Sequence, residues 1–370
     1  MRKLHIALIC AFLINAAFAT PVGASSRAHV VIEQKTKAIL YENNAHERLP
    51  MASTTKIATA IVAIESGKLN ETVTVSSRAA GVSGSSLYLK AGDTIQLGEL
   101  IAATLFVSAN DGTVAIAEHI DGTMEKFVDR MNAYVKKLGL ENTNFANPHG
   151  LTAENHYSTA YDLAYIMATA IENETFLKMV SSQTWSVTIN GETKMYLNKD
   201  QFLYLYEYSI GGKTGLTSAA GRCFVSASEQ NGLTLCSTVL NSSNIYNESI
   251  NLMNTAFSEY KLSCAVRKGE YIATVPIEGG RQSELKLKFI DDIYVPTKKS
   301  EPDDFKVEAY YEEYLQAPIA KNQIIGKYYI ISGQNVLIEG NIQSPRRVVA
   351  KEPFVQGFLK WYRYLLELAV

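Results

Sequence analysis

The sequence predicts an α/β (α+β) domain with an antiparallel sheet, followed by a small all-β domain and a terminal amphipathic helix. Segments rich in β-branched and aromatic residues open and close the first part of the chain, and helical segments lie between them. Short strand-like runs then occupy residues 264–345, and helical periodicity returns after residue 353. The 370 residues, 47% hydrophobic and 19% charged, suit about two globular domains of roughly 150 residues each.

Residues 1–19 have the pattern of a secretory signal peptide. Met1-Arg2-Lys3 is basic, the run from Leu4 to Phe18 is apolar, and Ala17-Phe18-Ala19 offers small residues for cleavage. This order is typical of a removable leader, and the apolar run is too short to span a bilayer. We therefore expect the protein to work outside the cytoplasm.

Residues 20–263 are expected to form the α+β domain. The segment from Val30 to Tyr41 has a hairpin pattern, and Ile57–Ile64 predicts a buried helix with Ser53 near its start. Further helices are expected at about Leu97–His119, Met124–Leu138 and Ala160–Ile171, and strands at Gly212–Ser228 and Leu233–Leu240. With strands at both ends, one sheet is expected to join the beginning and the end of the domain.

Residues 264–345 are expected to form the small β domain. Tyr271–Ile277 and Tyr328–Ile331 are β-branched or aromatic runs, and Gly279-Gly280 and Ser332-Gly333 supply turns. Short strands at this spacing are typical of an all-β domain. No group of residues in this part of the sequence suggests catalysis.

Residues 346–370 are expected to form a basic amphipathic helix that associates with membranes. Gln356, Lys360, Arg363 and Glu367 share one helical stripe, and aromatic and aliphatic residues cover the rest. Five basic and two acidic residues give this segment a net charge of +3, the sign that anionic lipids attract. Docking of the helix on the β domain or on a partner is the alternative. With the leader, the helix predicts peripheral attachment to the outer face of the cytoplasmic membrane.

The overall charge argues against a nucleic-acid-binding protein, and the cysteines argue against a disulfide framework. Lys and Arg number 35 against 37 Asp and Glu, so the chain lacks the basic field that binds phosphate backbones, and no nucleic-acid partner is expected. Outside the leader, Cys223, Cys236 and Cys264 are an odd number. Cys223 and Cys236 flank the Asn231-Gly232 turn about four residues out of register, too far apart to bridge, so we expect all three cysteines to be buried thiols.

Ser53-Thr54-Thr55-Lys56 places a hydroxyl and an amine three positions apart at a helix start. This spacing puts both groups on one helical face, within reach of each other. A serine becomes a nucleophile when a base takes its proton, and lysine is such a base where burial or nearby cations lower its pKa. On its own, however, the tetrapeptide is a weak signal, because S-x-x-K occurs by chance in many chains and usually marks a solvated helix start.

Ser108-Ala109-Asn110 lies at a connection between helices. Ser and Asn are common helix caps, which is the simplest explanation for them. The functional alternative makes Ser108 a hydroxyl relay between Lys56 and the leaving group, and lets the Asn110 side chain hold a substrate amide.

Gly212-Lys213-Thr214-Gly215 opens a strand. The glycines allow close backbone approach of a ligand, and the ammonium with the hydroxyl suits a carboxylate. A phosphate-binding P-loop is excluded because it requires glycine at position 207, which is Glu207.

In combination, the order Ser-x-x-Lys, Ser-x-Asn, Lys-Thr-Gly is the signature of serine penicillin-recognising enzymes. The sequence around these motifs resembles the D-alanyl-D-alanine carboxypeptidases, which are low-molecular-weight penicillin-binding proteins of the bacterial cell wall. The similar segments are His46–Lys56, Phe145–Leu151, His156–Ala164, and Gly212–Thr217 followed by Ala220-Gly221. The resemblance covers roughly residues 28–345, and it implies a serine β-lactamase/penicillin-binding transpeptidase-like fold for the first domain.

The resemblance implies removal of the terminal D-alanine from peptidoglycan stem pentapeptides, a reaction of cell-wall synthesis. Ser53 would be the nucleophile, Lys56 the general base, and Ser108 the group that returns the proton to the leaving amine. Asn110, Lys213, Thr214 and Gly215 would bind substrate, and the backbone N–H groups of Ser53 and Leu216 would bind the oxyanion. β-Lactams would acylate the same serine. Leu216 stands where relatives often have a polar residue or histidine, and its side chain cannot hydrogen-bond.

Two other functions remain open from the sequence. A β-lactamase of the same fold commonly uses a glutamate-activated water, but no E-x-x-L-N segment lies between Asn110 and Lys213. A non-catalytic wall-binding protein would not need the reactive side chains that are all present. No metal or other cofactor is expected, because a zinc-peptidase motif such as H-E-x-x-H is absent from the sequence.

Overall fold

The computed structural model describes residues 26–333, 335–351, 358–359 and 361–365. The expected leader, residues 1–19, lies outside these ranges. The chain divides into two compact units, residues 1–258 and 259–370. Residue 264, where we expected the β domain to begin, lies within β10 (Tyr260–Val266), the first strand of the second unit.

The first unit is built on a five-stranded antiparallel sheet with the order β2-β1-β9-β8-β7. Its strands are β1 (Ala28–Glu33), β2 (Ile39–Asn43), β7 (Ser209–Thr217), β8 (Gly221–Gln230) and β9 (Leu233–Leu240). Ala28 of β1 pairs with Leu240 of β9, which confirms that one sheet joins the beginning and the end of the domain. The β8–β9 turn has φ of 53° at Asn231 and 80° at Gly232, as a two-residue hairpin turn requires.

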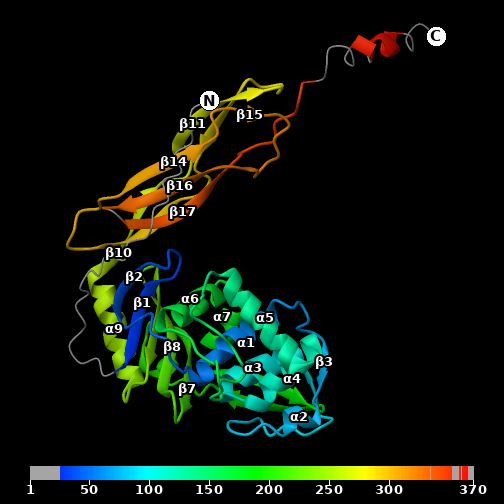
Figure 1. Cartoon of the computed structure of the whole chain (residues 1–370), viewed down its shortest axis with the longest axis vertical. Helices are drawn as coiled ribbons and strands as arrows, with labels where there is room; N and C mark the ends of the chain where they lie inside the picture. The colour runs from blue at the N-terminus through cyan, green and yellow to red at the C-terminus, as the bar shows by residue number, and fades with distance from the viewer. Residues whose placement is uncertain (1–25, 334, 352–357, 360, 366–370) are drawn as a thin grey trace. The chain divides into compact units, whose positions relative to one another are not determined.

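Helices cover both faces of this sheet, so its strands are buried on both sides. Cys223 and Val225 of β8 face the helical core, whereas Phe224 between them contacts Tyr246 of α9 (Ile245–Glu259). α6 (Ala160–Ala170) packs on β1, β8 and β9, while α9 lies on the opposite side of the sheet (Figure 1).

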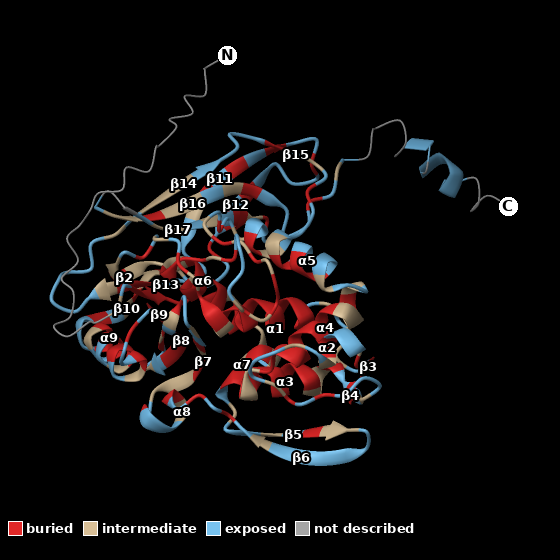
Figure 2. Cartoon of the chain, turned by 60° about the horizontal axis from the view of Figure 1, so that its bottom comes forward, coloured by how far each residue is buried: buried red, intermediate tan, exposed pale blue. Residues whose placement is uncertain are grey.

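The helical region contains the buried helix α1 (Lys56–Ile64), preceded by the 3₁₀ turn η1 (Ala52–Thr55). All nine residues of α1 are buried, as Figure 2 shows, because neighbouring helices surround it. The remaining helices are α2 (Ser77–Ala80), α3 (Leu97–Val107), α4 (Asn110–Asp121), α5 (Met124–Lys137), α7 (Glu174–Ser181) and α8 (Phe202–Leu205). The expected helical segment Leu97–His119 is thus two helices, which the sequence already suggested by placing Ser108 at a connection.

A second antiparallel sheet borders the helices in the order β3-β4-β5-β6. Its strands are β3 (Thr72–Thr74), β4 (Thr94–Gln96), β5 (Thr184–Ile189) and β6 (Glu192–Leu197). The sequence did not predict this sheet, nor α7 and α9. Most of β6 is exposed, so its residues lack the apolar alternation that identifies a half-buried strand.

Residues 260–343 of the second unit form only strands and their connections, as expected. Its sheets have the orders β10-β13, β12-β11-β15 and β14-β16-β17. After β10 the strands are β11 (Tyr271–Glu278), β12 (Glu284–Lys288), β13 (Ile293–Lys298), β14 (Lys306–Tyr311), β15 (Leu315–Gln316), β16 (Ile324–Ser332) and β17 (Asn335–Gln343). Alternate residues of β11, such as Ala273, Val275 and Ile277, enter one small core.

The three described cysteines are free. Cys236 pairs in register with Ala227, four positions from Cys223, which confirms the register argument against a disulfide. Cys223 and Cys236 are buried, but Cys264 is only half-buried, so the expectation of a buried thiol is wrong at that position. Residues 263–266 form an irregular part of β10, where the pairing with β13 shifts register and leaves Cys264 partly open to solvent.

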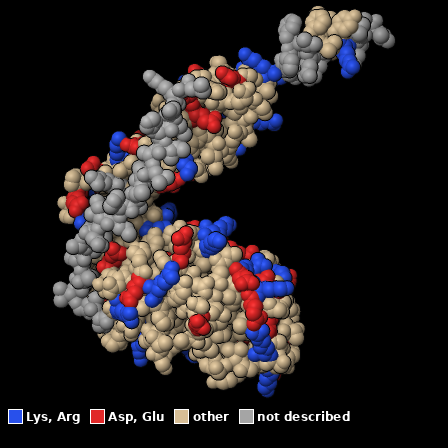
Figure 3. All heavy atoms as spheres, in the orientation of Figure 1, with Lys and Arg blue, Asp and Glu red and all other residues tan. Residues whose placement is uncertain are grey.

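The helix expected over residues 346–370 is wrong at its start, because residues 346–351 are not helical: Val348 and Ala350 form β-bridges with Ile319 and Gly280. Beyond residue 351 the structure describes residues 358–359 and 361–365, which are helical, and the rest of the predicted helix lies outside the described residues. Phe358, Leu359, Trp361 and Leu365 there are 41–55% exposed. None of the helices in the described ranges is both long and apolar enough to cross a membrane. On the face shown in Figure 3, basic and acidic residues are interspersed over each unit.

Candidate active site

The turn that carries Ser53 is fixed by close backbone packing. Ser53 lies in η1, and Lys56 begins α1 directly after it. A Cβ at Gly215 of β7 would lie 2.8 Å from the Ser53 nitrogen, and one at Gly150 would lie 1.9 Å from the Ala52 oxygen. Only glycine permits such contacts, so β7 and the loop at Gly150 hold the serine turn from two sides.

Lys56 is fully buried and contacts Ser53 directly. Its Nζ lies 2.9 Å from Ser53 Oγ and donates to Asn110 Oδ1 at 2.8 Å and to the His149 carbonyl at 2.7 Å. Burial lowers the pKa of Lys56 well below its usual value, and the charge of Lys213 lowers it further, whereas Asp111 raises it. A lysine with a lowered pKa, in contact with a serine hydroxyl, can accept the hydroxyl proton.

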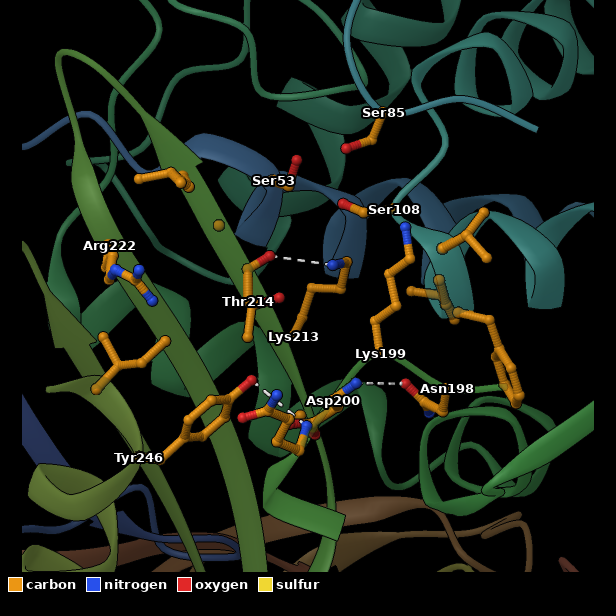
Figure 4. Close-up of a pocket in the computed structure, with 18 residues that line it drawn as sticks. Ser53, Ser85, Ser108, Asn198, Lys199, Asp200, Lys213, Thr214, Arg222 and Tyr246 are labelled. Atoms are coloured by element: carbon orange, nitrogen blue, oxygen red, sulfur yellow. Dashed lines mark hydrogen bonds between the residues drawn. The ribbon is translucent and has the colours of Figure 1, made fainter. Parts of the chain in front are cut away.

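Ser108 and Asn110 lie where α3 ends and α4 begins. Ser108 has a left-handed backbone with φ of 62°, which breaks the helix and places its side chain in the pocket beside Ser53 and Lys213 (Figure 4). Asn110 is buried, and its Nδ2 donates to the Ser83 carbonyl at 2.8 Å. Since its Oδ1 accepts from Lys56, both ends of the Asn110 amide are engaged within the protein. This arrangement favours a role in holding Lys56, and contact of Asn110 with a substrate amide stays a prediction.

Lys213 and Thr214 line the opposite wall of the pocket on β7. Lys213 is only 4% exposed, and its Nζ donates to the Thr214 carbonyl at 3.0 Å. Burial lowers the pKa of Lys213 to about 8, and Asp200 opposes that effect. Leu216 follows at the pocket rim with its side chain 65% exposed, so only its backbone can serve an oxyanion site.

The pocket also contains residues that the sequence motifs did not indicate. They are Ser85, Asn198, Lys199, Asp200, Arg222 and Tyr246. None belongs to a recognisable motif, because each enters the pocket through tertiary packing rather than sequence spacing. Asp111 was also missed although it follows Asn110; its carboxylate accepts from Ser86 Oγ and from the backbone N–H groups of Leu87 and Leu89.

A pocket serine in contact with a buried lysine of lowered pKa, with a second buried lysine on the strand beside it, defines the class of active-site serine acyl-transfer enzymes. The profile of the family described as D-alanyl-D-alanine carboxypeptidase matches residues 15–244. The profile of the C-terminal domain of penicillin-binding protein 5 matches residues 260–352. The chain belongs to the D-alanyl-D-alanine carboxypeptidase family and is a serine-type carboxypeptidase.

Individual relatives match along nearly the whole chain. D-alanyl-D-alanine carboxypeptidase DacF of Bacillus subtilis is 32% identical over 349 residues, covering 91% of this chain and 88% of the relative. D-alanyl-D-alanine carboxypeptidase DacA of Haemophilus influenzae is also 32% identical, over 362 residues covering 90% and 91%. The crystal structure of penicillin-binding protein 5 from Haemophilus influenzae superposes with a TM-score of 0.74 at 30% identity, covering 90% of this chain and 99% of that one. The likeness confirms the penicillin-binding fold with its added β domain.

Proposed function

We propose that this enzyme removes the terminal D-alanine from peptidoglycan stem pentapeptides through an acyl-enzyme on Ser53. The observation that carries the proposal is the 2.9 Å contact between Ser53 Oγ and the buried Lys56 Nζ. The named activity of the relatives supports the choice of substrate.

Acylation begins when neutral Lys56 takes the proton of Ser53 Oγ. The oxygen attacks the carbonyl carbon of the penultimate D-alanine, and the backbone N–H groups of Ser53 and Leu216 receive the oxyanion. Collapse of the tetrahedral intermediate breaks the peptide bond, and the proton passes from Lys56 through Ser108 to the departing amine. Water then attacks the ester, Lys56 removes a proton from it, and Ser53 regains its hydrogen.

The terminal carboxylate is bound by Lys213 and Thr214. Burial of Lys213 strengthens its attraction for an anion, since little water competes with the ligand. This contact selects substrates with a free C-terminus. β-Lactams also carry a carboxylate beside an acylating carbonyl, so we propose that they enter the same subsite and acylate Ser53.

Mass spectrometry of the protein with penicillin, and separately with a D-Ala-D-Ala pentapeptide, tests the assignment. The wild type should gain the mass of the drug on the peptide that contains Ser53 and should release D-alanine, whereas Ser53→Ala should do neither. The nearby Ser85→Ala variant keeps Ser53 and should still be acylated. Release of D-alanine by Ser53→Ala would show that the nucleophile is wrong, and rapid loss of the drug adduct would favour a β-lactamase.

We further propose that the protein is secreted and attached to the outer face of the cytoplasmic membrane through residues 346–370. The exposed aromatic side chains of Phe358 and Trp361 support this placement, because such residues enter the lipid interface. Deletion of residues 353–370 should leave peptide hydrolysis intact and move the protein from the membrane to the soluble fraction. Tyr271→Ser, which removes a similarly exposed aromatic from the β domain, should not. Unchanged sedimentation of the deletion variant with membranes would refute the anchor.

A further inference from the structure

Asp200 is a buried carboxyl in the pocket that the proposed mechanism does not use. It lies between β6 and α8 and is 4% exposed. Its Oδ1 accepts from the Phe202 N–H at 3.0 Å, and its own N–H donates to Asn198 Oδ1 at 3.0 Å. Its Oδ2 is buried and has no hydrogen-bond partner among the described residues. A buried oxygen without a partner is costly, so it requires an explanation.

Lys213 is the charged group on which the Asp200 carboxylate acts. In Figure 4, Lys213 lies between Ser53 and Asp200. Its ammonium carries three N–H donors, but the Thr214 carbonyl is the one hydrogen-bond acceptor found for it among the described residues. No ion pair within 4.0 Å joins Asp200 to Lys213 in that part of the chain, so the carboxylate acts on the ammonium through space or through a bridging water.

The other charged and titratable groups around Asp200 come from three elements. Lys199 precedes it in the loop, Arg222 comes from β8, and Tyr246 comes from α9. Lys199 lowers the pKa of Lys213, whereas Asp200 raises it. Burial raises the pKa of Asp200 itself to about 6, while the Phe202 N–H and Lys213 lower it. Near neutral pH the carboxyl is therefore ionised and favours a charged Lys213.

We propose that Asp200 is a positioning residue that keeps the Lys213 ammonium charged and directed into the pocket, where it binds the substrate carboxylate. The inference rests on the carboxylate subsite of the proposed function. It explains why a buried acid is placed on the far side of Lys213, where asparagine would provide the same acceptor for the Phe202 N–H without the charge. It also predicts that substrate recognition weakens at alkaline pH once Lys213 loses its proton.

Asp200→Asn is the decisive variant, because the amide keeps an oxygen for the Phe202 N–H and removes only the charge. With a peptide that ends in D-Ala-D-Ala, the alkaline limb of kcat/KM should move to lower pH. At about pH 8.5 the loss should be about tenfold, mainly through KM, which corresponds to a fall of the Lys213 pKa by about one. A peptide of the same sequence with a C-terminal amide should be cleaved equally by both enzymes. Asp129→Asn, which removes an exposed carboxylate from α5, should leave the pH profile unchanged.

An unshifted alkaline limb, or an equal loss with the amide-terminated peptide, would overturn the role of Asp200. If the wild type releases no D-alanine, the proposed function fails, and ¹³C NMR titration of labelled lysine still tests the inference without turnover. The Lys213 resonance should titrate at lower pH in Asp200→Asn. Should that variant not fold, the Asp200 carboxyl can be titrated in the wild type and in Lys213→Gln, where its pKa should rise. Unchanged titration in either comparison would refute the coupling.

Discussion

Replacing Gly150 with alanine should displace the catalytic serine. Gly150 has φ of +91°, and an added Cβ would lie 1.9 Å from the Ala52 oxygen, 2.4 Å from the Ala52 carbon and 2.9 Å from the Ser53 nitrogen. All three atoms belong to the backbone, which cannot rotate away as a flexible side chain could. To restore an ordinary contact of about 3.4 Å, the serine turn or the loop must move by about 1.5 Å.

The size of that movement sets the expected loss. Misplacing a reacting group by about 1 Å can cost roughly 100-fold in rate, so acylation of Ser53 should fall at least about 100-fold. The left-handed backbone adds about 1–2 kcal/mol for a residue with a Cβ, and the repacking adds about 1–3 kcal/mol. The free energy of unfolding should therefore fall by about 2–5 kcal/mol. Second-order acylation by a fluorescent penicillin measures the first effect, and urea unfolding measures the second.

Gly139→Ala is the matched control. Gly139 has φ of +78°, but nothing lies within 4 Å of its added Cβ. This variant should lose only the roughly 1–2 kcal/mol of backbone strain and keep its acylation rate. If Gly150→Ala acylates within about threefold of Gly139→Ala, the claim that the Gly150 loop holds the serine turn is refuted.

Three other perturbations have expected outcomes. Because burial lowers the pKa of Lys56, acylation should be fast near neutral pH and should fall on acidification as the amine gains a proton; a rate that rises only toward the usual lysine pKa would contradict this. Asp111→Ala leaves the buried N–H groups of Leu87 and Leu89 unpaired and should lower the free energy of unfolding by about 3 kcal/mol, with faster amide exchange at Leu87. The buried His156 has its pKa lowered to about 4, so the unfolded chain binds the extra proton between about pH 6.5 and 4. Stability should fall across that window by up to about 3 kcal/mol, and His156→Gln should flatten the urea-midpoint profile against pH.

The sequence was informative where short-range spacing determines the geometry. The three-residue separation of Ser53 and Lys56 placed both groups on one face, and the structure brings them into contact. The strands at both ends of the domain predicted the sheet closure that Ala28 and Leu240 make. Helix periodicity alone predicts the first of these features, and the strand pattern alone predicts the second.

The rest could not be predicted, because it depends on partners distant in sequence. Asp200 becomes unusual only once folding buries it beside Lys213, and an isolated Asp in a polar loop gives no such signal. Contact of Asn110 with a substrate amide stays a prediction, whereas the hydrogen bond that its oxygen accepts from Lys56, more than fifty positions earlier in the chain, was not predicted. The hairpin of β5 and β6 was not predicted. Apolar residues such as Met195 and Leu197 are exposed there, so the strand lacks a clear alternation of buried apolar and exposed polar residues.

The pairing of β1 with β9 also determines when the domain can finish folding. β1 is among the first strands to be synthesised, yet its central partner is complete only when Leu240 has been made. Until then β1 has β2 on one side and an open edge on the other, and an open edge is a site for aggregation. The helices between them can form from local contacts, whereas closing so long a loop is slow. A ribosome-bound chain that still lacks Leu240 therefore cannot complete its active site, because β7 joins the sheet only through β8 and β9.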